Sequence, residues 1–163
     1  MAAYDRLVRQ LPNRLQILGI GVEGHIGFVE RGAAARDTGV MLVKLASSTL
    51  KANEDDFRLR SPGGDDCSVE PAHYAITQGI GTVLSAGAIL MLAWGVKKRA
   101  AVERMLLHDP GTQNPAGWIQ AHENVTVVLD EDAFGNLNVN DLAARGFRVE
   151  RHEVPHKDEI YGY

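Results

Sequence analysis

Cysteine is almost absent from this 163-residue chain, which contains it once, at Cys67. A single cysteine excludes an intrachain disulfide and a metal cluster built from several thiolates. Free thiols are ordinary in the reducing cytosol, so this cysteine usage fits a cytoplasmic protein.

Long apolar runs are missing as well. The longest covers residues 86–95, whereas a helix that crosses a bilayer needs about 20 apolar residues. Residues 1–6 lack the apolar core of a signal peptide. We therefore predict a soluble, cytoplasmic protein with no membrane partner.

The chain also lacks a run of Lys and Arg, and its formal net charge is −4. Duplex nucleic acid is normally bound by a concentrated basic surface, so no nucleic-acid partner is expected. An anionic substrate would have to be held by a local positive site. The composition, 45% hydrophobic and 23% charged, is typical of a globular protein, and we predict one domain over residues 1–163, with a tail of uncertain structure at 147–163.

Metal ligands and cofactor contacts are not indicated. His152 and His156 have a spacing that binds metal only in a helix, and Pro155 between them disfavours one. Trp94 and Trp118 are expected to pack against other residues rather than contact a cofactor. We predict no metal and no cofactor.

Apolar runs and helical spacings alternate along the chain. Strands are predicted at residues 15–20, 40–45, 74–78, 89–94 and 125–129. Helices are predicted at residues 3–11, from Ser47 or Ser48 to about Phe57, and at 82–85, 97–107 and 142–144, with loops at 21–39 and 60–70. This order predicts an α/β fold with an open, mostly parallel, Rossmann-like sheet flanked by helices, and the run at 15–20 suits a strand buried on both faces. Ligands bind such sheets beyond the C-terminal strand ends, here after Ile20, Gln78, Trp94 and Leu129.

The segment after the first predicted strand carries the most chemistry. Gly21 and Gly24 allow a sharp turn and close approach to a ligand, and His25 lies between two acids, Glu23 and Glu30. Nearby carboxylates favour a protonated imidazole and can fix its tautomer, which suits proton transfer near neutral pH. A surface loop with a solvated histidine and two solvated glutamates is the alternative.

A dinucleotide-binding fingerprint, Gly19-x-Gly21-x-x-Gly24, also fits as a pattern. That fingerprint requires a helix to start inside it and an acidic residue about 20 positions later. Gly27 and Gly32 interrupt the helix, and the stretch around Lys44 offers no carboxylate. Nucleotide binding is therefore disfavoured.

The run Glu23-Gly24-His25-Ile26-Gly27-Phe28-Val29-Glu30 resembles the signature of the glucosamine-6-phosphate deaminases, Asp-Gly-His-Ile-Ala-Phe-Asn-Glu. The resemblance implies that His25 opens the pyranose ring of a hexosamine 6-phosphate, assisted by Glu30 and Glu23. The related 6-phosphogluconolactonases carry Asp-Gly-His-Thr-Ala-Ser instead, so this run favours the deaminase branch.

Three later segments follow the order of the same family, and the similarity covers roughly residues 3–133. They are the strand and Thr-x-Gly-x-Gly-Thr turn at 74–84, the strand and Gly-x-x-Lys at 89–98, and the Gln-x-His segment with its strand at 115–130. The resemblance makes Lys98 a ligand of the substrate phosphate. Lys98 also falls in the first turn of a predicted helix, where free backbone N–H groups and the helix dipole favour an anion. A plain surface lysine is the alternative.

The sequence also departs from the family. Family members carry a phosphate-binding loop and a proton-transferring aspartate in an N-terminal half, and neither is found here. Glu23 replaces Asp, Arg31 replaces Pro, and the family's phosphate-binding arginine aligns near Asp55. We expect the chain to self-associate as a homo-oligomer or to dock with a chain that supplies the N-terminal half. The open functions are deamination to fructose 6-phosphate and ammonia, a lactonase-like or other sugar-phosphate isomerase reaction, and a non-catalytic sugar-phosphate-binding or assembly subunit.

Overall fold

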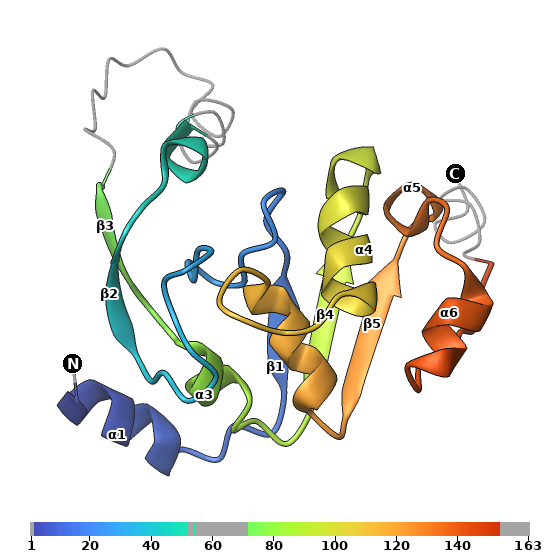
Figure 1. The fold of residues 1–163 in the computed structure, drawn as a ribbon. Coiled ribbons are helices and arrows are strands. Elements are labelled where there is room, and N and C mark those ends of the chain that lie inside the picture. Colours follow the sequence, from blue (N-terminus) through green and yellow to red (C-terminus); the bar gives the residue numbers. More distant parts are fainter. Residues whose placement is uncertain (1, 52–53, 55–71, 154–163) are drawn as a thin grey trace, which may run out of the picture.

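The computed structural model describes residues 2–51, 54 and 72–153, which form a three-stranded and a two-stranded sheet with short helices around them (Figure 1). The strands are β1 Gln16–Gly19, β2 Met41–Lys44, β3 Tyr74–Thr77, β4 Ile89–Ala93 and β5 Val125–Leu129. The helices are α1 Ala2–Gln10, α3 Ile80–Val83, α4 Arg99–Leu107, α5 Glu131–Phe134 and α6 Val139–Ala144, with 3₁₀ helices η1 Val96–Lys98 and η2 Pro115–Ala121.

All five predicted strands are present, and so are the predicted helices within the described residues. Residues 47–51 are helical, while the predicted helix end near Phe57 and the turn-rich segment 60–70 lie outside the described residues. The helices η2 and α5 were not predicted, because one is a 3₁₀ helix that begins at Pro115 and the other has only four residues.

The larger sheet has the strand order β1-β4-β5, and all its strands are parallel. Leu18 lies opposite Met91, which in turn lies opposite Val127. This confirms the predicted α/β class with an open parallel sheet. Because parallel strands end at one edge, the segments that follow β1, β4 and β5 lie near one another there.

Strands β2 and β3 form a separate antiparallel pair, with Leu42 opposite Ile76. The prediction of one mostly parallel sheet therefore needs correction for residues 40–45 and 74–78. Both strands have one buried and one exposed face, as antiparallel pairs commonly do. Their apolar composition does not say which strand each one pairs with.

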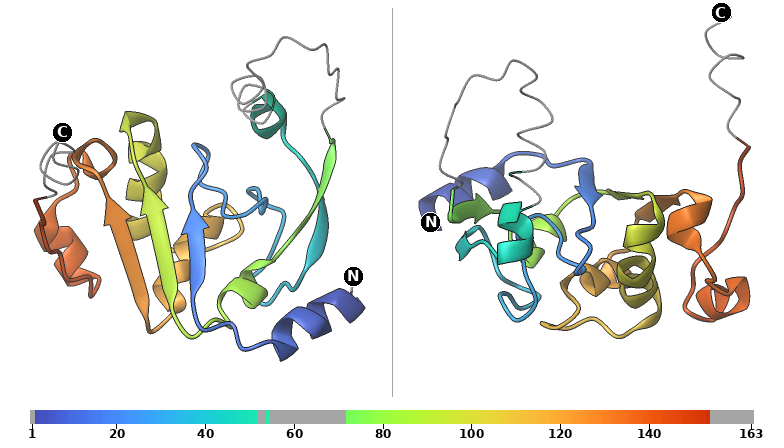
Figure 2. Two further views of the ribbon diagram at one scale, coloured as in Figure 1. Left: turned by 180° about the vertical axis from the view of Figure 1, so that it is seen from behind. Right: turned by 90° about the horizontal axis from the view of Figure 1, so that it is seen from above.

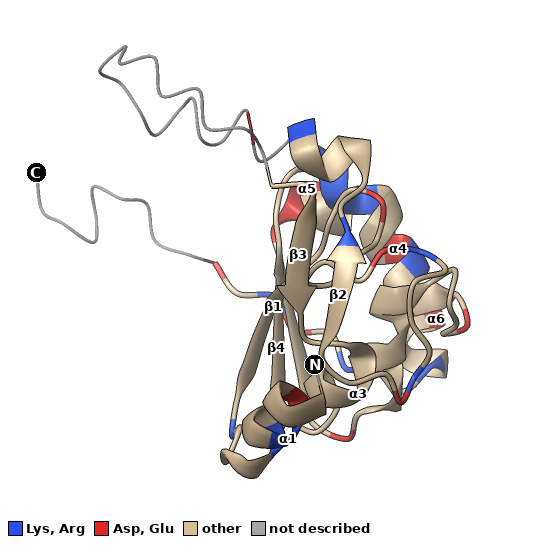
Figure 3. Cartoon of the chain, turned by 90° about the vertical axis from the view of Figure 1, so that its left-hand side faces the viewer, with Lys and Arg blue, Asp and Glu red and all other residues tan. Residues whose placement is uncertain are grey.

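One face of the larger sheet packs against helices and the other is open within the described residues. Leu18 and Met91 are buried in a core shared with Val102 and Met105 of α4. In the edge-on view, α4 and α6 lie on one side of β1 and β4 (Figure 3), and the view from above shows the same one-sided arrangement (Figure 2).

The open face carries large apolar side chains. Ile17 of β1 is 58% exposed and Val128 of β5 is 50% exposed. The prediction that the first strand is buried on both faces is therefore wrong for Ile17. Trp94, expected to pack, is 70% exposed directly after β4, whereas Trp118 packs against the core.

None of the helices among the described residues is long and apolar enough to cross a membrane.

Candidate active site at the end of β1

The loop after β1 turns back on itself through short backbone hydrogen bonds. The Gly21 N–H donates to the His25 carbonyl at 2.9 Å, and the Gly24 N–H donates to the Gly21 carbonyl at 2.9 Å. Gly24 has φ +88°, which side-chain-bearing residues rarely adopt. Ile26 then enters the core and forms isolated bridges with Ile20 and Val29. The turn therefore holds His25 beside the end of β1.

The ring of His25 occupies the space that a side chain at Gly21 would need. A Cβ atom at Gly21 would lie 2.2 Å from Cε1 and 2.3 Å from Nε2 of the imidazole. Van der Waals contact between such atoms requires more than about 3 Å, so only glycine leaves room for this ring position. Gly21 and Gly24, predicted to contact substrate, thus have a visible part in shaping the loop around His25.

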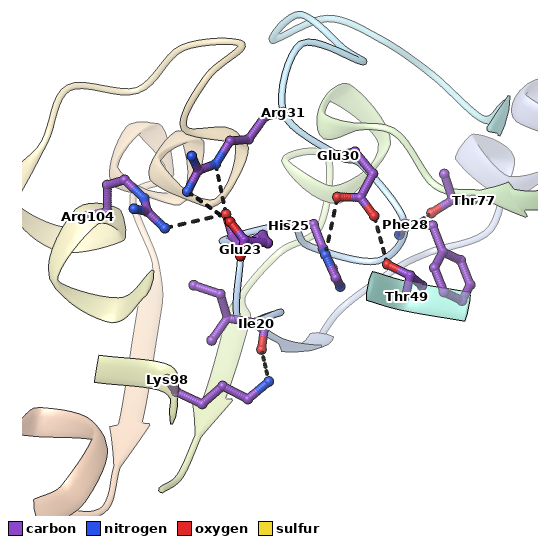
Figure 4. A network of polar contacts seen from close by, with 10 residues as sticks. All are labelled: Ile20, Glu23, His25, Phe28, Glu30, Arg31, Thr49, Thr77, Lys98 and Arg104. Atoms are coloured by element: carbon purple, nitrogen blue, oxygen red, sulfur yellow. Dashed lines mark hydrogen bonds and ion pairs between the residues drawn. The ribbon is translucent and has the colours of Figure 1, made fainter. Parts of the chain in front are cut away.

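His25 and Glu30 come together as a pair. His25 Nδ1 lies 3.5 Å from Glu30 Oε2, and both side chains are largely shielded from solvent (Figure 4). The distance is that of an ion pair and is too long for a good hydrogen bond. Nδ1 is buried, and within the described part of the chain it has no hydrogen-bond partner. A carboxylate facing Nδ1 favours the tautomer that carries the proton on that nitrogen, which leaves Nε2 as the other reactive position.

Glu23, which was predicted to assist His25, contacts arginines instead. Its carboxylate forms an ion pair with Arg31 at 3.6 Å and is mostly exposed. Its backbone carbonyl accepts hydrogen bonds from Arg31 Nε at 2.9 Å and from Arg104 Nη2 at 3.4 Å. Among the described residues the imidazole of His25 therefore meets one acid, Glu30, while Glu23 is held by two arginines.

Lys98 reaches the same place from the end of β4. Its Nζ donates a 2.7 Å hydrogen bond to the carbonyl of Ile20, the residue before Gly21 (Figure 4). Burial lowers the pKa of Lys98 from its usual value. Within the described ranges no carboxylate lies within ion-pair distance of its ammonium group. A partly desolvated cation without a counter-charge is a suitable position for an anionic ligand group.

The backbone N–H group at the start of η1 already has a partner within the protein. The backbone N–H of Gly95, at the start of η1, donates to both carboxylate oxygens of Asp130, at 2.9 and 3.0 Å. Asp130 also accepts from the Ala133 N–H at 2.7 Å and so caps α5. An acid of the protein thus already satisfies this N–H group, and the Lys98 side chain points toward Ile20 instead.

Two buried threonines that sequence reasoning missed also contact the site. Thr49 Oγ1 donates to Glu30 Oε1 at 2.8 Å, and Thr77 Oγ1 accepts from the Phe28 N–H at 3.1 Å. Thr77 lies in a segment that resembles the family, but Thr49 carries no local signal. The described residues contain no group of three or more His, Cys, Asp or Glu side chains that could hold a metal ion.

Comparison with known proteins points in one direction. A glucosamine-6-phosphate deaminase from Leuconostoc citreum is 40% identical over 134 residues, which are 82% of this chain and 54% of that protein. The enzyme of the same name from an Exiguobacterium species is 41% identical over 145 residues, covering 89% of this chain and 53% of that protein. No family model matches the chain.

Solved structures give a consistent result. A monomeric glucosamine-6-phosphate deaminase has a TM-score of 0.70 and 35% identity, over 82% of this chain and 52% of that one. The 6-phosphogluconolactonase from Trypanosoma brucei has a TM-score of 0.58 at 18% identity, over 84% of this chain and 52% of that one, which shows a shared fold. Over most of its own length the chain is therefore similar to glucosamine-6-phosphate deaminases, and it spans about half the length of the relatives it matches.

Proposed function

We propose that this chain supplies the ring-opening and phosphate-binding part of a glucosamine-6-phosphate deaminase site. The complete reaction would convert glucosamine 6-phosphate and water to fructose 6-phosphate and ammonia. The observation that carries the proposal is the meeting of His25, Glu30 and Lys98 around the Ile20–Gly21 turn.

His25 has the chemistry that ring opening requires. The C1–O5 bond breaks, the ring oxygen gains a proton and the C1 hydroxyl loses one as the aldehyde forms. The Nε2 position, on the far side of the ring from Glu30, would exchange these protons, while Glu30 stabilises the charged imidazolium in between. Positioned acid–base groups of this kind typically contribute about 10²–10⁴-fold to a rate.

Lys98 would hold the substrate phosphate. Its ammonium lies at the end of β1, beside the turn that seats His25, and no acid among the described residues neutralises it. An incoming phosphate would supply the missing counter-charge. Asp55, which aligns near the family's phosphate-binding arginine, lies outside the described residues.

Identity favours the deaminase over the lactonase reaction. The deaminase relatives are 35–41% identical to this chain, whereas the solved lactonases from Leishmania guyanensis and two Trypanosoma species are 18–19% identical. The lactonase likeness supports the fold alone. A lactonase or other isomerase activity is accordingly the less supported alternative.

Activity would depend on a partner surface. The open sheet face with Ile17 and Val128 is apolar, and a parallel sheet normally has both faces covered. The matched relatives are about twice as long as the matched region. A polypeptide equivalent to their unmatched half would cover this face and complete the site, and a second copy of this chain is the alternative occupant.

The test measures ammonia release from glucosamine 6-phosphate. The full chain is assayed alone and together with the unmatched half of the Leuconostoc citreum relative, produced as a separate polypeptide. Ammonia in the combined sample supports the proposal. Thermal stabilisation by the sugar phosphate without ammonia in either sample would indicate a non-catalytic binding subunit. The absence of both thermal stabilisation and ammonia release would contradict the deaminase function and the binding function alike.

A further inference from the structure

Two threonines outside the glycine-rich loop hold the segment that carries Glu30. Thr49 is 6% exposed and belongs to the helical residues 47–51 that follow β2. Thr77 is 7% exposed and ends β3. Both therefore come from the β2–β3 pair and its continuation, and neither belongs to the parallel sheet that carries His25.

Thr49 fixes one oxygen of the Glu30 carboxylate. Its hydroxyl donates to Oε1 at 2.8 Å, while Oε2 faces His25 Nδ1 at 3.5 Å (Figure 4). Because a carboxylate is planar, a hydrogen bond to one oxygen restricts the direction of the other. Hydrogen bonds to an ionised group are about twice as strong as neutral ones, so this restriction is appreciable.

Thr77 fixes the backbone of the same segment two residues earlier. Its hydroxyl oxygen accepts from the Phe28 N–H at 3.1 Å and its hydrogen is directed to the Gln78 carbonyl at 3.2 Å. A Cβ atom at Gly27 would lie 2.8 Å from the same oxygen, and Gly27 has φ +56°. The backbone can thus approach Thr77 this closely because position 27 is glycine.

We infer that Thr49 and Thr77 are positioning residues, through which the antiparallel β2–β3 pair aims the Glu30 carboxylate at the His25 ring. Thr49 fixes the orientation of the Glu30 carboxylate, and Thr77 fixes the position of the backbone at Phe28, two residues before Glu30. The antiparallel β2–β3 pair then helps to position the proposed catalytic residues and does not only stabilise the fold. The inference rests on the proposed role of His25 and Glu30 for its catalytic consequence, but its geometry can be tested without turnover.

The test reads the tautomer of His25 by ¹⁵N NMR of the histidine-labelled full chain, at a pH where the ring is neutral. In the wild type the proton resides mainly on Nδ1, facing Glu30. Thr49→Val keeps the shape of the side chain but removes the donor, and we expect the ratio of Nδ1–H to Nε2–H to fall several-fold. Thr49→Ser restores the hydroxyl and returns the ratio to the wild-type value.

Thr82→Val is the matched control. Thr82 is also buried and donates to a carboxylate, Asp5 Oδ1, at 2.9 Å, but it lies away from His25. Thr82→Val should destabilise the fold about as much as Thr49→Val does and leave the His25 tautomer ratio unchanged. An unchanged ratio in Thr49→Val, or an equal fall in Thr82→Val, would overturn the inference.

A kinetic readout separates this inference from the proposed function. In the combined sample that releases ammonia, Thr49→Val should lower kcat several-fold with little change in KM, because the substrate contacts remain. A tautomer change without any ammonia release from the wild type would uphold the positioning role and count against the deaminase function. Full kcat in Thr49→Val would overturn the positioning role alone.

Discussion

Gly21 is the residue on which the position of the His25 ring depends most directly. The imidazole lies where the first side-chain atom of any other residue would be, since a Cβ at position 21 would meet three of its ring atoms at 2.2–2.5 Å. The backbone of the turn cannot simply shift, because the Gly21 N–H is bonded to the His25 carbonyl. The ring and the glycine are therefore coupled.

Gly21→Ala should displace the ring and lower ammonia release in the combined sample by about 100-fold, the cost of misplacing a catalytic group by about 1 Å. Gly19→Ala is the control, since its Cβ would meet nothing nearer than the Leu92 carbonyl at 4.0 Å. The two variants are compared by their kcat values and by the ring resonances of His25. If Gly21→Ala releases ammonia as fast as Gly19→Ala, activity does not depend on the position of the His25 ring.

Lys98 can be tested against its neighbour in η1. Lys98→Met should abolish the rise in melting temperature that glucosamine 6-phosphate gives to the wild type, because the partly desolvated ammonium is its proposed phosphate ligand. Lys97→Met, which changes an exposed lysine, should retain it. Loss of the effect in both variants would indicate non-specific charge attraction instead.

The carboxylate of Asp5 links α1 to the start of β2 and to α3. Asp5 accepts hydrogen bonds from the Val40 N–H at 2.8 Å and from Thr82 Oγ1 at 2.9 Å, and it forms an ion pair with Arg9. No residue of α1 is fully buried, so the polar contacts of Asp5 are important for holding this helix. The hydrogen bond from Val40 is the main reason that the pKa of Asp5 is lowered below its usual value of 3.8.

This lowered pKa predicts a pH dependence. Below about pH 4 the unfolded chain takes up a proton at Asp5 before the folded chain does, so the contribution of Asp5 to stability is present above that pH and is lost as pH falls through the folded-state pKa. The free energy of unfolding, from urea titrations at several pH values, should fall more steeply on acidification in the wild type than in Asp5→Asn. Asp37→Asn, at an exposed position, should keep the wild-type slope; a wild-type slope in Asp5→Asn would contradict the assignment.

Helices and strands were predictable where the sequence signal is local. Which strand pairs with which was less predictable. The runs at β1, β4 and β5 predicted three strands of one parallel sheet, and His25 and Glu30, five residues apart in one loop, could be paired from sequence. The antiparallel pairing of β2 with β3 was missed because their apolar runs fit either sheet. Thr49 was missed because it is 19 residues from Glu30 in the sequence and no local pattern indicates that the two side chains meet.

At the scale of the whole molecule, the open sheet face is the main departure from an ordinary parallel sheet. The apolar run at 15–20 predicted burial on both faces, yet Ile17 is 58% exposed. The run is suited to a sheet covered on two sides, and this chain matches about half the length of its relatives. Sequence therefore described the strand correctly and its surroundings incorrectly.

Ile17→Lys should weaken association with the complementary half by about tenfold or more, since burying an isoleucine contributes about 1.5–3 kcal/mol. It should change the stability of the isolated chain little, because the side chain is already mostly exposed. Leu42→Lys is the control, at a position in β2 with the same 58% exposure. Calorimetry measures the affinity of each variant for the complementary half. An equal loss of affinity in both variants would show that Ile17 is not a specific contact. A wild-type chain that is a monodisperse monomer without affinity for the complementary half would contradict a partner on this face.

The most direct measurement compares His25→Ala with the wild type in the combined sample that holds the chain and the complementary half. If the imidazole at the end of β1 opens the sugar ring, ammonia release from glucosamine 6-phosphate should fall about 10²–10⁴-fold, with the sugar phosphate still raising the melting temperature. A His25→Ala variant that releases ammonia as fast as the wild type would contradict the proposed role of this residue.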